Sequence, residues 1–132
     1  MASPYTMVAI VDLAIDGSAS LLAEQSGRIL AEPSRVRVYA NREDVLVTFS
    51  MLVGKENVLE SGSGAALNTT VGDLPSTRDD LLVDTFGNVG DEVLIKGSNT
   101  NAAQKEARVI VMVTPLDDVV LQNAMNAAGV QV

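Results

Sequence analysis

The feature that most constrains this sequence is a regular alternation of side chains between residues 45 and 53. Every second residue there is apolar, and together these would share one face of an extended chain: Val45, Val47, Phe49, Met51 and Val53. The residues between them would share the opposite face, and these are Leu46, Thr48, Ser50 and Leu52. A repeat of two residues with many β-branched side chains is typical of a β-strand that buries one side.

Two short polar segments bound this strand and suggest how the chain continues. Arg42-Glu43-Asp44 precedes it and Gly54-Lys55-Glu56 follows it, and both are typical of turns. The segment before the first turn alternates in the same way, starting at Arg35, and the segment after the second turn runs to Ser61. Residues 35–61 therefore predict three successive antiparallel strands.

The last strand is predicted at 107–114 and differs from the others because both of its faces are largely apolar. One face would carry Ala107, Val109, Val111 and Val113. The other face would carry Arg108, Ile110, Met112 and Thr114. Ile110 and Met112 make this second face partly apolar, so the strand is expected to be central in its sheet or buried in an interface.

The remaining segments complete an all-β pattern. Strands are predicted at 5–14, 81–83 and 93–96, and the small polar residues of 98–103 predict a hairpin loop. Segment 19–30 fits either a helix or strands, and two short extended pieces are favoured because a Gln-Ser-Gly sequence interrupts its apolar residues.

Strands do not alternate with helices along the chain, so parallel βαβ units are not expected. The predicted fold is a single all-β domain over residues 1–132, an antiparallel β-sandwich or jelly-roll-like barrel with a short C-terminal helix.

Three segments are expected to lie outside the strands. Residues 1–4 predict a flexible N-terminal tail, and 62–79 predict a long surface loop of the kind that often serves contacts. A helix is predicted at 115–128, because Thr114 can cap it, Pro115 suits its first position and Gly129 can end it.

Composition narrows the classes of function. The 132 residues include no Cys and no His, which removes thiolate chemistry and the commonest general base and metal ligand. We therefore expect no enzyme, no catalytic residue and no cofactor. Aromatic residues make up only 3% of the chain, so the core must be built from small aliphatic side chains.

Charge argues against a nucleic-acid partner, and the lengths of the apolar runs argue against a membrane span. The net charge is −8, and the basic residues form no patch of the kind that nucleic acid requires. Arg35 and Arg37 are the only close basic pair along the sequence, and we expect them to meet acidic partners across a sheet or a subunit boundary. No run of eighteen apolar residues is present, so no membrane span is expected.

Acidic pairs are the only candidates for a metal site. Calcium requires several oxygen ligands from a tight loop, and no segment has the EF-hand spacing. We expect these carboxylates to be solvated turn residues and helix starts, and we predict no metal site. If one group binds calcium, Asp79, Asp80 and Asp84 are the strongest candidates.

Residues 74–116 carry a resemblance to a known class of proteins. The segments DDLLVDTF (79–86), VGDEVLIK (89–96), GSNTNAA (97–103) and ARVIVMVTPL (107–116) follow one another as strands and turns. In this style of strand and turn the chain resembles small structural proteins of tailed-bacteriophage virions, of the cement or decoration type.

The resemblance implies a β-rich subunit that assembles with itself, commonly as a trimer, and binds the major capsid protein or another virion protein. It implies location in the virion and function through surfaces, without assigning individual residues. A different possibility is a β-sandwich module that binds carbohydrate or peptide. Sugar-binding sites usually expose aromatic side chains, and this chain has only two Tyr and two Phe, so the binding-module interpretation is weaker.

Overall fold

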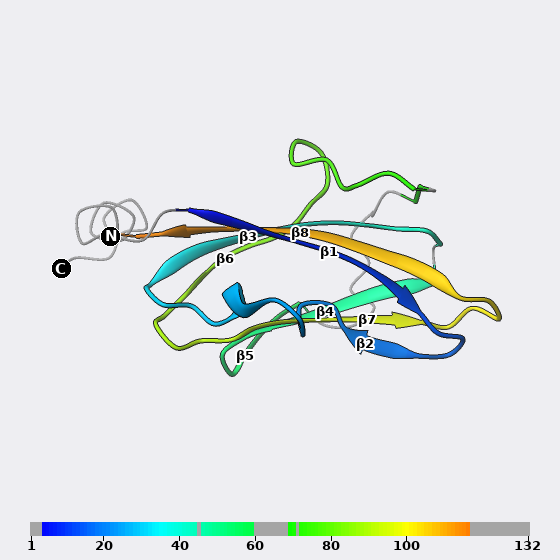
Figure 1. The fold of residues 1–132 in the computed structure, drawn as a ribbon, viewed down its shortest axis with the longest axis horizontal. Helices are drawn as coiled ribbons and strands as arrows, with labels where there is room; N and C mark the ends of the chain where they lie inside the picture. The colour runs from blue at the N-terminus through cyan, green and yellow to red at the C-terminus, as the bar shows by residue number, and fades with distance from the viewer. Residues whose placement is uncertain (1–3, 45, 60–68, 71, 117–132) are drawn as a thin grey trace.

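The computed structural model describes residues 4–44, 46–59, 69–70 and 72–116, and these form eight β-strands and one 3-10 turn (Figure 1). In chain order the elements are β1 (Tyr5–Leu13), β2 (Ser18–Ser20), η1 (Ser26–Arg28), β3 (Ser34–Arg42), β4 (Val47–Val53), β5 (Glu56–Leu59), β6 (Leu81–Gly87), β7 (Val93–Asn99) and β8 (Lys105–Pro115).

The strands make two antiparallel sheets of four strands each. One sheet has the order β1-β8-β3-β6 and the other has the order β2-β7-β4-β5. The two sheets lie one above the other (Figure 1) and share one hydrophobic core. The prediction of an all-β antiparallel fold is confirmed, and β8 is central in its sheet, between β1 and β3.

The strand pairs are nested along the sequence. β4 pairs with β5, β3 with β6, β2 with β7 and β1 with β8, as in one long hairpin. Further pairing of β3 with β8 and of β4 with β7 completes the two sheets. The tip of this long hairpin is Gly54-Lys55, where Gly54 has a φ of +61°. A tight hairpin turn needs a positive φ at its first central position, which glycine adopts without a steric penalty.

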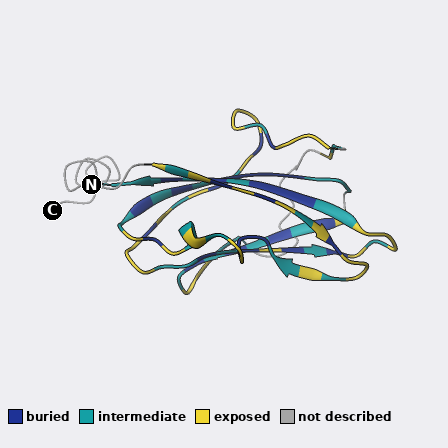
Figure 2. Ribbon diagram, in the orientation of Figure 1, coloured by how far each residue is buried: buried dark blue, intermediate teal, exposed yellow. Residues whose placement is uncertain are grey.

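Alternation of side chains builds the core. Along β4, Val47, Phe49, Met51 and Val53 are buried, as the sequence predicts. Along β8 the fully buried set is Ala107, Val109, Val111 and Val113. Buried and more exposed residues alternate along these strands (Figure 2). Phe49 is the one aromatic residue among the buried core residues that the structure describes, so the core is mainly aliphatic.

Two predicted connections are wrong. β3 does not pair with β4, because the 42–44 turn carries the chain from one sheet to the other. Residues 98–103 do not close a hairpin either, since β7 and β8 also belong to different sheets. The physical reason is that alternation shows which face of a strand is buried but not which strand lies at its edge. Two strands with one apolar face each can pack across a core instead of pairing.

The 19–30 segment contains less extended chain than predicted. β2 ends at Ser20, a turn and η1 follow, and Ile29 then forms an isolated bridge with Glu92. The segment nevertheless buries Leu21, Leu22 and Leu30, which belong to the hydrophobic core.

The predicted C-terminal helix is not observed in the described residues. Pro115, its predicted first residue, is instead the last residue of β8, and the backbone N–H of Leu116 donates to the Pro33 carbonyl at 2.8 Å. Pairing with β3 thus continues where helix capping was expected. Residues 117–128 of that prediction, 1–3 of the predicted tail, and 62–68 and 71 of the predicted loop lie outside the described residues. No described helix is long and apolar enough to cross a membrane.

Candidate interaction surface

An apolar strip lies on the outward face of the β1-β8-β3-β6 sheet. Val8 and Ile10 of β1 point away from the core and are 44% and 55% exposed. Ile110 and Met112 of β8 point the same way and are half-buried. Val8 lies opposite Ile110 in the register, so these four side chains are adjacent. We call Val8, Ile10, Ile110 and Met112 the outer strip.

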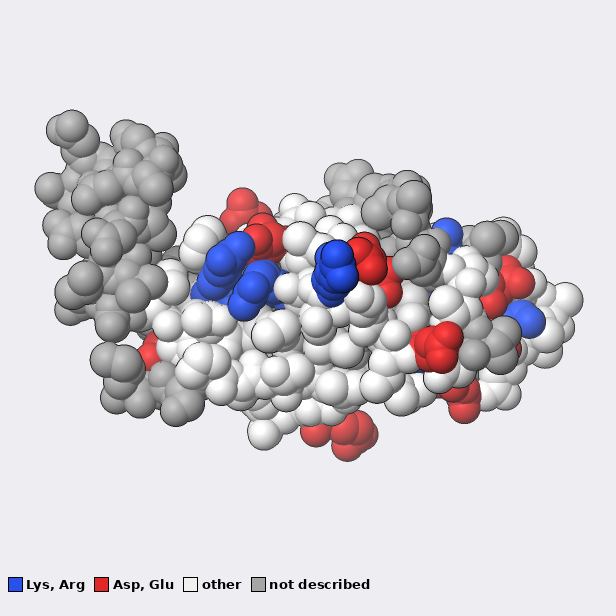
Figure 3. Space-filling model, turned by 90° about the horizontal axis from the view of Figure 1, so that it is seen from above, with Lys and Arg blue, Asp and Glu red and all other residues white. Residues whose placement is uncertain are grey.

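The strip is bordered by charge at the Arg35 end of β3. Arg35 makes a two-point ion pair with Asp84 of β6. Its Nε donates to Oδ1 at 2.9 Å and its Nη2 donates to Oδ2 at 2.5 Å. This hydrogen bond holds the pKa of Asp84 below its usual value of 3.8 and raises the pKa of Arg35. The predicted acidic partner of Arg35 across the sheet is therefore confirmed. Figure 3 looks onto this face and shows basic and acidic side chains side by side near one end.

Arg37 is placed differently. It lies opposite Asp84 in the register, yet that carboxylate is already held by Arg35. Arg37 forms no ion pair with any described residue, and its Nε donates no hydrogen bond. Arg37 therefore acts on Asp84 through its charge alone, which also lowers the pKa of that carboxyl, while Arg35 makes the hydrogen bonds.

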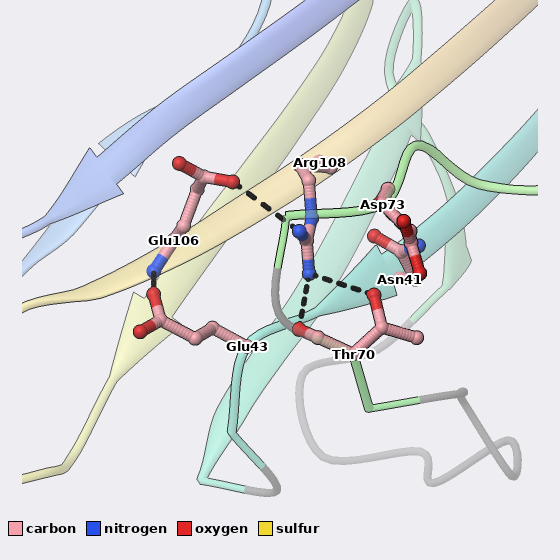
Figure 4. Close-up of polar contacts among 6 residues, drawn as sticks. All are labelled: Asn41, Glu43, Thr70, Asp73, Glu106 and Arg108. Carbon is pink, nitrogen blue, oxygen red and sulfur yellow. Dashed lines mark hydrogen bonds and ion pairs between the residues drawn. The ribbon is translucent and has the colours of Figure 1, made fainter.

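A polar cluster lies at the other end of the same face (Figure 4). Arg108 of β8 is only 1% exposed although it points outward, and Thr70 lies against its guanidinium. Its Nη2 donates to the Thr70 carbonyl at 2.7 Å and to Thr70 Oγ1 at 3.3 Å. Its Nη1 lies 3.4 Å from Glu106 Oε1. Asn41 of β3, opposite Arg108 in the register, donates from Nδ2 to the Asp73 carbonyl at 2.9 Å.

This cluster holds Thr70 and Asp73 against the sheet. Arg108 and Asn41 bind the backbone carbonyls of these two residues, and the Thr70 N–H donates to the Arg42 carbonyl at 3.0 Å. The cluster is incompletely satisfied among the described residues, since Arg108 Nε and Nη1 donate no hydrogen bond and Asn41 Oδ1 accepts none. The part of the predicted 62–79 loop that the structure describes is thus anchored to strands β3 and β8.

The candidate calcium residues are not brought together. Asp80 is 9% exposed, and its Oδ2 accepts a hydrogen bond from the Ser76 N–H at 2.6 Å. Asp79 is exposed in the turn, and Asp84 is bound to Arg35. Among the described residues no group of three acidic side chains is placed to hold a metal ion. These carboxylates shape a turn and an ion pair.

The roles of Arg108 and Asn41 were not predicted from the sequence. A signal for Arg108 was present, because it is the only charged residue in 107–114. Such a residue on a central strand must find polar partners or water. Nothing in the sequence indicates that its partner is Thr70, which lies 38 positions away.

No protein-family model matches this chain, and no curated protein or solved structure is significantly similar to it.

Proposed function

We propose that this protein is a structural component of a tailed-bacteriophage virion, a cement or decoration protein that binds and stabilises the phage head. The observation that carries the proposal is the outer strip, in which the exposed Val8 and Ile10 of β1 lie beside the half-buried Ile110 and Met112 of β8. Contiguous exposed apolar surface marks a site of contact with another protein.

The strand order supports the same conclusion. We assign the two sheets, ordered β1-β8-β3-β6 and β2-β7-β4-β5, to the jelly-roll architecture, because eight strands paired as one folded hairpin define it. Viral capsid domains use this architecture, as do lectins. The likeness is one of fold, so it supports a structural role without identifying the contact residues.

The proposed protein acts through surfaces, without catalysis and without a cofactor. Its location is the virion and its partner is the major capsid protein or another virion protein. It assembles with itself, and the resemblance favours a trimer. The N-terminal tail and the loop before β6 are the segments proposed to reach the capsid, while the sheet face serves self-assembly.

The test is cosedimentation of the purified full chain with heads of the parent phage that lack their accessory protein. We expect saturable binding and a higher temperature of head disruption. A variant that lacks residues 1–4 should bind heads more weakly while it unfolds at the same temperature.

The deletion must stop at residue 4. Tyr5 belongs to β1, and its hydroxyl donates to the Gly27 carbonyl at 2.6 Å, so a longer deletion would also damage the fold. Absence of head binding by the intact protein would reject the proposal. Binding to an oligosaccharide or peptide array in that case would favour the β-sandwich binding module.

A further inference from the structure

We infer that copies of this chain assemble by exchanging β1, so that β1 of one copy leaves its own sheet and pairs with β8 of another. Residues 14–17, which connect β1 to β2, are the hinge that opens. The inference rests on the self-assembly part of the proposed function and deepens it, whereas head binding is tested separately. After exchange, the outer strip of each unit is built from two chains.

β1 is placed so that it can be replaced by an identical strand. It lies at the edge of its sheet, and β8 is the one strand with which it pairs. Its inward residues Met7, Ala9 and Leu13 belong to the shared core. A second copy supplies the same three side chains to the same positions, so exchange conserves the burial of β1. The exchanged and unexchanged forms therefore differ mainly at the hinge.

The closed hinge is strained. Among the residues that the structure describes, Asp16 alone combines a side chain with a positive φ, which is +51°. The Gly17 N–H donates to the Ala14 carbonyl at 3.0 Å and closes the tight turn around it. The left-handed region is unfavourable for a residue with a Cβ atom, so opening the turn releases Asp16 from it. Short hinges under strain favour exchange between copies.

The ends of the hinge are held by Asn99 of β7. The Asn99 N–H donates to the Gly17 carbonyl at 2.8 Å, and its Nδ2 donates to the Leu13 and Ala14 carbonyls, each at 3.2 Å. Asn99 can hold the end of β1 in this way whichever copy supplies the strand. The Gly17–Ala14 hydrogen bond is thus the one described hinge bond that exchange must break. Ile15 is 57% exposed in the turn, and its β-branched side chain favours the extended conformation of an open hinge.

The nested strand order gives exchange an opportunity during folding. Tyr5 of β1 lies opposite Val113 of β8, so this pair closes the longest loop of the described chain. Long loops cost more entropy to close than short ones. β8 also pairs with β3, so its other edge can accept β1 from a neighbouring chain before its own β1 has docked. Exchange should therefore increase with the protein concentration during refolding.

The chain has no Cys, so an engineered disulfide can report which copy supplies β1. Val8 and Ile110 lie directly opposite each other in the β1–β8 register. The full-length Val8→Cys/Ile110→Cys variant is refolded from urea at micromolar concentrations and oxidised. We expect disulfides between chains, in a species that sediments as an oligomer and separates into single chains on reduction. The single Val8→Cys variant measures the background of collisions. Links within single chains alone, or links between chains no more frequent than this background, would overturn the inference.

A matched pair of hinge and control substitutions tests the strain. In the two-cysteine background, Asp16→Gly places there a residue that adopts a positive φ freely. The ratio of links between chains to links within chains should fall at least about fivefold. Asp79→Gly makes the same change in an exposed turn without a positive φ, so the ratio should not change. No fall with Asp16→Gly, or an equal fall with both, would overturn the inference. Exchange without head binding would reject only the proposed function.

Discussion

Arg108 places a guanidinium where its strand would otherwise carry an aliphatic side chain. Its charge-assisted hydrogen bond to the Thr70 carbonyl, 2.7 Å long, contributes about 1.5–3 kcal/mol. Its Nη1 faces Glu106 Oε1 at 3.4 Å, whereas its Nε is buried without a partner, and an unfilled donor of this kind costs about 1–3 kcal/mol. The two contributions nearly cancel. Arg108 therefore positions Thr70 more than it stabilises the fold.

Replacing Arg108 by Met should separate these two effects. Met fills similar space without polar atoms, so the free energy of unfolding should change by less than about 1 kcal/mol in urea titrations. The Thr70 amide, which donates to Arg42, should exchange its hydrogen faster. Arg108→Ala is the control, and the cavity it leaves should cost about 2–4 kcal/mol. A loss of several kcal/mol in the Met variant would show that the polar contacts dominate.

The Arg35–Asp84 pair makes stability depend on pH in the acid range. The pKa of Asp84 lies below 3.8 in the folded protein, because Arg35 hydrogen-bonds its charged form. The pair therefore stabilises the fold above the unfolded pKa, and this contribution disappears as the pH falls through the folded pKa. The pair is partly exposed, so it is worth about 0.2–1 kcal/mol. NMR titration of Asp84 should show its pKa return toward 3.8 in Arg35→Met, and an unchanged value would contradict the assignment.

The sequence predicts where the strands lie better than it predicts which strands pair with each other. The alternation in β4 and β8 identifies the buried faces correctly, because the polarity of a side chain indicates whether it faces the core or the solvent. Pairing depends on contacts between distant segments, so the alternation could not reveal that the 42–44 turn crosses between sheets. The interaction surface was partly predictable in the same way. Ile110 and Met112 indicated a second apolar face, but the contact of Thr70 with Arg108 required the folded arrangement.

Gly87 in β6 shows how closely the two sheets approach. A Cβ atom added there would collide with Leu30 Cδ1 and would lie 2.9 Å from Val53 Cγ1, and the branched Val53 has little freedom to move. Gly87→Ala should therefore destabilise the fold by about 1–3 kcal/mol through overpacking.

Gly97 in β7 is the matched control for that substitution. Its added Cβ would meet Leu13 Cδ1 at 3.2 Å and Leu21 Cδ2 at 3.4 Å, and both are ends of flexible side chains. Gly97→Ala should cost less than about 1 kcal/mol, because these side chains can shift slightly. Equal midpoints for the two variants in thermal unfolding would contradict this account of the core.

In the whole molecule, the nested strand pairs close loops of increasing length, so each pair further out costs more conformational entropy to form. The β4–β5 hairpin joins neighbouring residues through a two-residue turn at Gly54. The β1–β8 pair joins the two ends of the described chain, with Tyr5 opposite Val113. Closing such a long loop costs more conformational entropy than closing a short one. We therefore expect slow folding, on the millisecond to second scale that is common for all-β sandwiches, with the outermost pair forming late.

Substitution of two buried methionines tests whether the β4–β5 hairpin forms before the β1–β8 pair. Met7 on β1 lies opposite Val111, and Met51 on β4 lies opposite Leu59, only eight positions along the chain. Both side chains are buried in the same core, so Met→Ala at either position should cost about 2–5 kcal/mol at equilibrium. If the hairpin forms early, Met51→Ala should slow folding, whereas Met7→Ala should mainly accelerate unfolding. Stopped-flow measurements across a urea series give both rates for each variant. The reverse pattern would show that β1 and β8 meet before the hairpin is complete, and the nested pairs would then not form from the inside outward.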